Sequence, residues 1–444
     1  MQNDVADDGL HPCREGERMR VLLVGGGGRE HAIAWKLRQS SRLTALYCAP
    51  GNAGIAQIAQ CVDIAATDIA GVVRFAKHEK IDLVIVAPDD PLAMGMVDAL
   101  EKEGIRAFGP NQAAARIESS KVFSKDLMNK YGIPTAQYAV FDDVDRARAY
   151  LQTCTFPVVV KADGLALGKG VLICQNQEEA QKAIRTCMID CAFGDSGKTI
   201  IIEEFMKGPE MSILAFADGN DIVPMISAQD HKRAFDGDQG PNTGGMGTFA
   251  PSPYMTPELE KTFREEIMWP TMTAMEKEGC PFSGVLYFGL MLTADGPKVL
   301  EYNARFGDPE TQVVLPLLKT DLLDIMEAVV GKRLKNQQIE WRDGAAVCVV
   351  LASKGYPGSY PKGIPIDGLE AVEKAGKAVV FHAGTKMAEN GRFETNGGRV
   401  LGVSALGNDL ADAAKNAYAA VQMISFEGVH YRHDIAGKYL EHSE

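Results

Sequence analysis

The first part of the chain alternates short apolar runs with stretches of helical periodicity. Apolar residues fill positions 20–24, 43–48 and 81–87, and each run has the length of a buried strand. A helical stretch over residues 30–37 lies between the first two runs. Strands that alternate with helices favour a doubly wound parallel sheet. The pattern therefore predicts an α/β domain over residues 19–120.

In the region that follows, the spacing of the apolar runs changes. Residues 156–161 and 171–174 predict two strands on either side of a glycine-rich loop, as in an antiparallel hairpin. A further apolar run at residues 200–205 predicts another strand. We expect these elements to belong to a second domain over residues 121–333.

The last part of the chain has a third pattern, in which strands are followed by one long helix. Helical periodicity places the apolar residues of 409–423 on one face. The strands expected before this helix lie at residues 345–351, 378–382 and 399–403. The pattern predicts a small α+β domain over residues 334–444.

Composition and charge restrict the class of protein. The 444 residues are 46% hydrophobic and 24% charged, which is ordinary for a folded protein of roughly three domains. The formal net charge of −13 argues against a nucleic-acid partner, because proteins that bind phosphate backbones carry basic faces. No apolar run approaches the length of a spanning helix, so no membrane partner is expected.

The first residues and the cysteines bear on where the protein works. Residues 1–18 are polar and acidic without an apolar core, so we expect a disordered extension rather than a signal peptide or an anchor. The nine cysteines include no Cys-x-x-Cys pair, and the closest spacing, Cys187 to Cys191, has no histidine ligand set nearby. We interpret them as reduced thiols of a cytoplasmic protein, most simply as buried small apolar side chains.

The sequence EYNARFGDPETQ, which begins at Glu301, combines a polar face with an apolar one. Alternation along a strand places Glu301, Asn303 and Arg305 on one face and Tyr302 on the other. A carboxylate and an amide oxygen on one rigid face suit a hard cation such as Mg²⁺, and a neighbouring arginine can hold a phosphate or carboxylate. The alternative is a solvated face with a surface ion pair. A further carboxylate in the next turn, Asp308, favours the metal site.

The glycine run GGGGREH at residues 25–31 follows the first strand and resembles a dinucleotide-binding loop only in part. Glu30 stands where the third glycine belongs, and the second strand ends without the acidic residue that holds a ribose hydroxyl, so NAD binding is not expected. Exposed amides at the helix N-terminus, with the loop APGNAG at residues 49–54, could instead hold a single phosphate. The alternative is that the glycines serve only a tight turn.

The sequence KADGLALGKG at residues 161–170 fails as a P-loop, because its spacing is one residue short and it lacks the Ser or Thr that meets Mg²⁺. Lys161 at a strand end could contact the α and β phosphates of a nucleotide, while a flexible loop with Lys169 covers the β and γ phosphates and excludes water. A plain mobile hairpin is the alternative. Downstream, backbone groups of 203–205 could bind an adenine edge, and Glu210 a ribose.

Residues 229–253 show no apolar period, and we expect a long loop there. Loops of this length in compact domains are usually functional or disordered. Asp230 and Lys232 belong to a cluster of mixed charge, and the glycines of GPNTGGMG give the backbone freedom to surround small anions. The alternative is that the charges form a solvated face.

Six motifs together resemble one family. In chain order GGGGREH, APGNAG, KADGLALGKG, QDHKR, GPNTGGMG and EYNARFGDPETQ are similar to motifs of the phosphoribosylamine–glycine ligases, a family of the ATP-grasp superfamily, over residues 19 to about 439. The resemblance implies an α/β and α+β multidomain protein, with a Rossmann-like N-terminal domain, an ATP-grasp domain and a small C-terminal α+β domain.

The same resemblance implies a reaction. ATP, glycine and 5-phospho-D-ribosylamine would give glycinamide ribonucleotide, ADP and phosphate through a glycyl phosphate, as a step of de novo purine biosynthesis. ATP would be a co-substrate, the metal Mg²⁺ or Mn²⁺, and the protein a cytoplasmic monomer or small homo-oligomer that acts on small molecules.

The resemblance also implies roles for individual residues. The metal ligands would be Glu301 and Asn303. The residues near glycine and the transferred phosphate, expected to be catalytic, are Arg305, Asp230 and Lys232. The ATP site would comprise Lys121, Lys161, Gly168, Lys169, Gly170, Glu203, Glu204, Phe205 and Glu210. The remaining substrate contacts would come from Gly27, Arg29, Glu30, Asn52, Gly54 and Asp308, with Asp230 and Arg305 shared.

One departure from the family pattern and two other classes of protein remain in view. Asp89 stands where glutamate is usual, and its shorter reach puts a substrate contact in doubt. An ATP-grasp carboxylase would share the nucleotide site but bind bicarbonate, and APGNAG, QDHKR and GPNTGGMG argue against it. A non-catalytic nucleotide-binding regulator would need no paired metal ligands.

Overall fold

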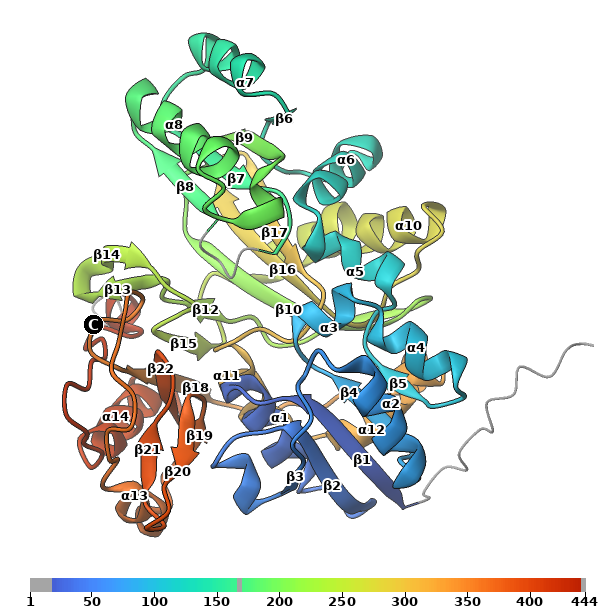
Figure 1. Cartoon of the computed structure of the whole chain (residues 1–444), viewed down its shortest axis with the longest axis vertical. Coiled ribbons are helices and arrows are strands. Elements are labelled where there is room, and N and C mark those ends of the chain that lie inside the picture. The colour runs from blue at the N-terminus through green and yellow to red at the C-terminus, as the bar shows by residue number, and fades with distance from the viewer. Residues whose placement is uncertain (1–17, 166–169, 441–444) are drawn as a thin grey trace, which may run out of the picture.

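The computed structural model describes residues 18–165 and 170–440 of the 444-residue chain. The expected extension at residues 1–18 therefore lies outside the described residues, apart from residue 18. Within the described part, no helix is long and apolar enough to cross a membrane. The architecture is the expected α/β and α+β multidomain one, with a parallel sheet at the N-terminus and antiparallel sheets elsewhere (Figure 1).

The N-terminal domain contains a five-stranded parallel sheet in the order β3-β2-β1-β4-β5, which confirms the predicted doubly wound sheet. Its apolar strands are buried because helices cover them. The strands are β1 Met19–Gly25, β2 Leu43–Pro50, β3 Gln60–Cys61, β4 Leu83–Val86 and β5 Ala107–Phe108. The helices are α1 Gly28–Leu37, α2 Ile69–His78, α3 Asp89–Ala93, α4 Met96–Lys102 and α5 Gln112–Ser119.

The order of the strands reverses between β1 and β4, which are neighbours in the middle of the sheet. In such sheets the loops after the two central strands diverge, and ligands bind in the crevice at the carboxyl ends of the strands. The glycine run leaves β1 at Gly25, and α3 begins at Asp89 just after β4. The topology thus brings the glycine run and Asp89 to one edge of the sheet.

A second, antiparallel sheet of four strands, here called the small sheet, stands apart at the top of the molecule in Figure 1. Its order is β6-β9-β7-β8, and the predicted hairpin is confirmed by the antiparallel pairing of β7 with β8. It has its own hydrophobic core with α7 and α8. Its elements are β6 Tyr138–Phe141, α7 Val144–Tyr150, β7 Val158–Ala162, β8 Val171–Cys174, α8 Gln177–Ile184 and β9 Ile200–Glu204.

A third sheet, the central sheet, lies below the small sheet and has the order β11-β10-β16-β17. Tyr302 is buried in its core, as the alternation predicts, but β17 ends at Asn303, so Arg305 lies beyond the strand. The strands are β10 Glu210–Asp218, β11 Ile222–Pro224, β16 Ser283–Thr293 and β17 Gly296–Asn303. The helices around it are α6 Lys121–Tyr131, α9 Pro257–Thr262, α10 Trp269–Lys277 and α12 Leu322–Val330. Helix α11 Thr311–Leu317 packs on α1 instead.

The prediction of a long loop over residues 229–253 is wrong, because this segment forms four short strands. They are β12 Gln229–Asp230, β13 Arg233–Phe235, β14 Gln239–Asn242 and β15 Gly247–Ala250. β13 and β14 pair as a hairpin, whereas β12 and β15 join the C-terminal sheet. The strands are too short for an apolar alternation to show in the sequence.

The C-terminal sheet has the order β12-β15-β18-β22-β19 and therefore combines the two strands above with three later ones. The predicted strands and the long helix are confirmed, and the alanines of α14 pack on the sheet. Its further strands are β18 Ala345–Ala352, β19 Ala378–His382 and β22 Arg399–Gly407. Strands β20 Thr385–Met387 and β21 Phe393–Thr395 pair as a separate two-stranded sheet. The helices of this part of the chain are α13 Leu369–Ala375, α14 Leu410–Val421 and α15 Gly437–Leu440.

Candidate active site

Glu301 lies at the centre of a charged cluster on the central sheet, with Asn303 two positions on along β17. Glu301 Oε1 is 3.7 Å from Lys232 Nζ, and Arg305 Nη2 donates to Asn303 Oδ1 at 3.1 Å. Burial opposes ionisation of Glu301, but the surrounding lysines and arginine hold its pKa below the ordinary value. Among the described residues no group of three or more acidic, histidine or cysteine side chains suits a metal alone. An ionised carboxylate beside an amide oxygen fits a hard cation that phosphate oxygens also coordinate.

Lysines from separate elements surround Glu301. Lys121 begins α6, Lys161 lies in β7, and Lys232 follows β12. Lys121 Nζ donates to Gly164 O at 2.7 Å, and burial lowers the pKa of this lysine although Glu301 opposes the change. The charges of all three ammonium groups act on the Glu301 carboxylate. Together they can neutralise the charge of a polyphosphate.

The small sheet contributes a buried ion cluster that sequence reasoning found only in part. Glu203 Oε2 lies 2.9 Å from Lys161 Nζ and 3.2 Å from Lys125 Nζ, and all three side chains are almost fully buried. Burial lowers the pKa of Lys125 to about 8, although Glu203 opposes the shift. The available signal for Lys125 was its place one helical turn after Lys121, on the same face of α6.

Two other predicted nucleotide residues, Glu210 and Glu204, pair with lysines at more exposed positions. Glu210 Oε2 lies 2.9 Å from Lys232 Nζ, so Glu210 and Glu301 share one ammonium group. Glu204 Oε1 is 3.7 Å from Lys298 Nζ on the neighbouring sheet. The chain next to strands β9 and β8 carries Phe205 and Gly170. Two of the predicted residues lie outside the described part of the chain: Gly168 and Lys169.

Arg305 is held by a carboxylate that the sequence did not reveal. Arg305 Nη2 is 3.0 Å from Glu118 Oε1, while Glu118 Oε2 accepts from Ala304 N at 2.7 Å. Burial raises the pKa of Glu118. Burial opposes ionisation of Arg305, but Glu118 and then Asp89 raise its pKa, so Asp89 does face this site. Arg305 Nε is buried and has no hydrogen-bond partner among the described residues.

Asp230 belongs to a second network, in which the charge of Glu310 acts on it. Asp230 Oδ1 is buried without a hydrogen-bond partner in the described structure, and burial with the charge of Glu310 raises its pKa well above the ordinary value. Glu310 Oε1 accepts hydrogen bonds of 3.1 Å from Ser212 Oγ and Tyr287 OH. The charge of Glu310 also acts on Arg305. The unpartnered acceptor Asp230 Oδ1 and the unpartnered donor Arg305 Nε therefore both lie near the carboxylate of Glu310. Sequence reasoning missed Glu310.

Asp308 lies among arginines at the junction with the C-terminal domain. Arg399 Nη2 is 3.0 Å from Asp308 Oδ2, and Gln312 Nε2 donates to Asp308 Oδ1 at 2.8 Å. Burial opposes ionisation, but Arg399 and Arg29 hold the pKa of Asp308 below its ordinary value. Arg399 was not predicted, because an arginine at the start of a strand carries no sign of a contact 91 residues away.

The expectation of exposed amides at the start of α1 is wrong for the glycine that caps it. Gly27 N donates to Glu30 Oε2 at 2.6 Å, so the helix is capped by its own glutamate. The other oxygen, Glu30 Oε1, is 2.6 Å from Arg29 Nε, and Arg29 Nη1 donates to Phe306 O at 3.1 Å. Both side chains are buried. Their predicted substrate contacts remain a prediction.

Asn52 and Gly54 connect the APGNAG loop to two other parts of the chain. Asn52 Nδ2 donates to Gly26 O at 2.9 Å and to His382 O at 2.8 Å, and Asn52 Oδ1 accepts from Gly54 N at 2.9 Å. A Cβ atom on Gly54 would lie 2.4 Å from His382 Cγ, so the loop can approach the C-terminal domain only with glycine there. The loop is therefore fixed between the glycine run and β19.

A small antiparallel sheet with a buried lysine, set over a central sheet that carries a carboxylate and an amide, defines an ATP-grasp enzyme. The comparison with family models agrees, since the N domain, the ATP-grasp (A) domain and the C domain of phosphoribosylglycinamide synthetase match residues 19–118, 119–311 and 346–438. The chain belongs to the phosphoribosylglycinamide synthetase family.

Close relatives of known name support this assignment. The chain is 51% identical to phosphoribosylamine–glycine ligase of Caldanaerobacter subterraneus subsp. tengcongensis, over 95% of this chain and 100% of the relative. It is 48% identical to the Clostridium acetobutylicum ligase, over 94% and 99%. It is 50% identical to the Gallus gallus trifunctional purine biosynthetic protein adenosine-3, over 94% of this chain and 42% of that protein.

Solved structures show the same fold. The crystal structure of phosphoribosylamine–glycine ligase from Thermotoga maritima matches with a TM-score of 0.82 and 34% identity, over 94% of this chain and 100% of the other. A Campylobacter jejuni biotin carboxylase matches with a TM-score of 0.70, over 93% of both chains, but at 15% identity. The second likeness concerns the fold alone.

Proposed function

We propose that this chain joins glycine to 5-phospho-D-ribosylamine, and that transfer of the γ-phosphoryl group of ATP to glycine forms a glycyl phosphate, so that the products are glycinamide ribonucleotide, ADP and phosphate. The reaction is a step of de novo purine biosynthesis. Relatives named phosphoribosylamine–glycine ligase, at 51% and 48% identity over nearly the whole chain, support the proposal.

One observation from the site carries the amino-acid part of the proposal. Arg305 Nε is a buried donor and Asp230 Oδ1 a buried acceptor, and neither has a partner among the described residues. Leaving such groups unsatisfied costs about 1–3 kcal/mol each, so a ligand that satisfies both is favoured. A zwitterion with a carboxylate for Arg305 and an ammonium group for Asp230 does so, and glycine is the smallest.

ATP and a divalent metal ion belong to the proposal, since the ATP-grasp fold is shared with a biotin carboxylase solved in complex with β-γ-ATP. Glu301 and Asn303 would hold the metal, either Mg²⁺ or Mn²⁺, which would neutralise phosphate charge. Lys121 and Lys161 would hold the phosphates. The small sheet, closed over them, would exclude water from the reacting groups.

In the proposed reaction, a glycine carboxylate oxygen attacks the γ-phosphorus of ATP, and ADP leaves. Arg305 orients the carboxylate, and Lys232 lies beside Glu301 where the transferred phosphate would pass. The amine of phosphoribosylamine then attacks the acyl carbon, phosphate leaves, and the nitrogen loses a proton. Asp308, held ionised by arginines, would orient the attacking amine.

The remaining expectations concern location and assembly. Free thiols at all the described cysteines suit the reducing cytoplasm, where we place the enzyme. Its partners would be the small-molecule substrates alone. We propose a monomer or a small homo-oligomer.

A coupled assay of ADP formation tests the function. ADP release should require ATP, glycine and phosphoribosylamine together, and omission of any one should stop it. Release that persists without glycine or without the ribosylamine would contradict the proposal. Dependence on bicarbonate in place of glycine would indicate a carboxylase.

A further inference from the structure

The end of the described chain lies beside the β13–β14 hairpin in Figure 1. Residues 430–439, here called the tail, contact residues 229–238, here called the 229–238 segment, which contains Asp230 and Lys232. The bond from His433 N to Asp236 Oδ1, at 2.8 Å, joins two residues that are 197 positions apart. The tail therefore links the end of the C-terminal domain to a part of the ATP-grasp domain.

Side chains alternate at the start of the 229–238 segment. Gln229 Nε2 donates to Tyr439 OH at 2.9 Å, and His231 Nε2 accepts from Ala436 N at 3.4 Å, so both side chains face the tail. Lys232 Nζ instead reaches the two carboxylates of the central sheet described above. Alternate residues of an extended chain face opposite sides. Contacts with the tail on one side thus fix the direction of Lys232 on the other.

Arg432 lies at the centre of this contact, and its side chain is fully buried. Arg432 Nη1 donates to Asp238 Oδ1 at 2.9 Å and to Arg233 O at 3.2 Å, both in the 229–238 segment. Its Nε and Nη2 donate to the two oxygens of Asp434 at 2.7 Å each. Asp434 Oδ2 in turn accepts from Gly237 N at 2.9 Å. The guanidinium and its paired carboxylate therefore both hold the segment.

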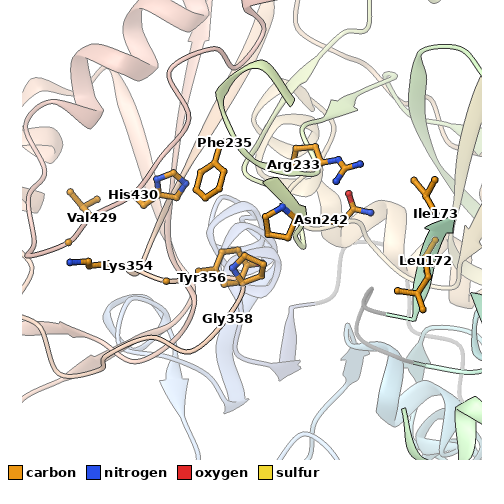
Figure 2. A pocket seen from close by; sticks show the side chains of 15 residues that line it. Leu172, Ile173, Arg233, Phe235, Asn242, Lys354, Tyr356, Gly358, Val429 and His430 are labelled. Carbon is orange, nitrogen blue, oxygen red and sulfur yellow. The ribbon is translucent and has the colours of Figure 1, made fainter. Parts of the chain in front are cut away.

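The contacts on either side of Arg432 extend this connection. His430 Nε2 donates to Ala234 O at 2.7 Å, and the Lys438 ammonium group pairs with Asp238. Figure 2, a view of the cavity that borders the hairpin, shows Phe235 beside His430. Their rings meet edge-on, with centroids 5.4 Å apart. The tail therefore holds the segment from its first residue to its last.

An arginine suits this position better than any other cation. A buried charge is costly unless it is paired and its N–H groups are bonded. The planar guanidinium presents its donors as a rigid fork, so it fixes the positions of Asp434, Asp238 and the Arg233 carbonyl relative to one another. A lysine would keep the charge but not the fork. Because Arg233 directly follows Lys232 in the chain, a shift of its carbonyl would move Lys232 as well.

We propose that Arg432 is a positioning residue for the reaction. Through Asp238 and the Arg233 carbonyl it holds Lys232 and Asp230 in place at the candidate active site. The inference rests on the proposed function, because that function gives Lys232 and Asp230 their roles beside the transferred phosphate and glycine.

Arg432→Lys tests the role by the split between kcat and KM. A displacement of about 1 Å at the reacting groups should lower kcat about 10- to 100-fold. The KM for ATP should stay unchanged, because Lys121 and Lys161 lie on α6 and β7, outside the segment. The matched control is Arg392→Lys, whose arginine pairs with Asp367 within the C-terminal domain, and it should change neither constant. An unchanged kcat in Arg432→Lys, or a KM for ATP that rises as much as kcat falls, would overturn the proposal.

Two further variants separate positioning from a general loss of stability. Asp238→Asn removes one partner of Arg432 at a side chain that is 40% exposed, and it should lower kcat by a smaller factor. Combined with Arg432→Lys it should lower kcat by less than the product of the two factors, because both changes act on one contact. Val403→Ala, at a buried residue of β22, should lower the thermal midpoint with kcat unchanged, because β22 pairs with neither β12 nor β15. A similar loss of kcat in Val403→Ala would overturn the proposal.

Hydrogen exchange separates this inference from the function itself. The His231 amide bonds to Gly247 O at 2.9 Å and should exchange slowly in the unmodified chain. In Arg432→Lys the amides of the 229–238 segment should exchange about 10-fold faster, with those of β16 unchanged. If the unmodified chain makes no glycinamide ribonucleotide, the function fails, and faster exchange in the variant still shows that Arg432 holds the segment. Normal product formation with unchanged exchange in Arg432→Lys would overturn the inference and leave the function standing.

Discussion

At the scale of single residues, the charge of Glu301 matters more than its shape. Its carboxylate is kept ionised by surrounding cations, and the proposed metal needs that negative charge. Glu301→Gln keeps the size and one oxygen but removes the charge. Glycine-dependent ADP formation should fall about 100- to 1,000-fold, as expected for the loss of one charge-stabilising contact. The coupled ADP assay measures this at saturating metal.

The matched control is Glu373→Gln, an exposed residue on α13, which should leave the rate unchanged. Circular dichroism and the thermal midpoint should be similar for the two variants, because Glu301 is only partly buried at 38% exposure of its side chain. A rate near that of the unmodified chain in Glu301→Gln would exclude the metal role.

Sequence reasoning could place Glu301 and Asn303 because residues two apart on a strand share a face. It could not place Glu118, Glu310 or Arg399, because these act across long separations in the chain; Glu118 Oε2, for example, meets Ala304 N at a separation of 186 residues. Nothing local distinguishes such a buried charge from a surface one until the fold brings its partner close.

At the scale of elements, α6, β7 and β9 are joined by one buried carboxylate. Glu203 accepts both Lys161 and Lys125, and Glu203→Gln would leave two ammonium groups buried without their counter-ion. The free energy of unfolding should fall by about 3–5 kcal/mol. Denaturant unfolding of the variant and of the unmodified chain measures the difference.

The neighbouring variant Glu204→Gln is the control, since its exposed pairing with Lys298 is worth at most about 1 kcal/mol. Adding Lys125→Met to Glu203→Gln should recover part of the loss, because one stranded charge is removed. Equal losses in Glu203→Gln and Glu204→Gln would show that the cluster does not hold these elements together.

The long apolar strands were predictable from sequence to within a few residues, and β8 and β19 agree with the prediction at both ends. The strands within residues 229–253 were not predictable from sequence. Strands β12 and β15 form by pairing with each other, and β15 also pairs with β18, which is far along the chain. Pairing of that kind depends on tertiary contact, and short segments give no period of their own.

At the scale of the whole molecule, α1 and β19 join the N-terminal and C-terminal domains through two buried histidines. His382 N donates to His31 Nδ1 at 2.8 Å, and their rings lie 5.6 Å apart. The rings of Trp35 and Phe381 add an edge-on contact at 5.7 Å. This contact also fixes the APGNAG loop, because Asn52 bonds to the carbonyl of His382.

The junction should weaken in acid. Burial, with the nearby His382, lowers the pKa of His31 to about 3, and burial lowers that of His382 to about 4, both from an ordinary 6.5. Below pH 6.5 the unfolded chain therefore binds protons that the folded chain does not. The contribution of these two histidines to the free energy of unfolding is complete above pH 6.5 and is lost as the pH falls toward 4 and 3. When the pH falls from 7 to 5, each histidine should lower the free energy of unfolding by about 2 kcal/mol.

His31→Asn tests this origin of the pH dependence, since an asparagine oxygen can still accept from His382 N but does not titrate. Urea unfolding at pH 7 and pH 5 should show a difference smaller by about 2 kcal/mol in the variant than in the unmodified chain. His78→Asn, at a side chain 83% exposed, should keep the full difference. The same pH dependence in His31→Asn and in the unmodified chain would show that the acid sensitivity arises elsewhere, and the junction would then tolerate a charged His31.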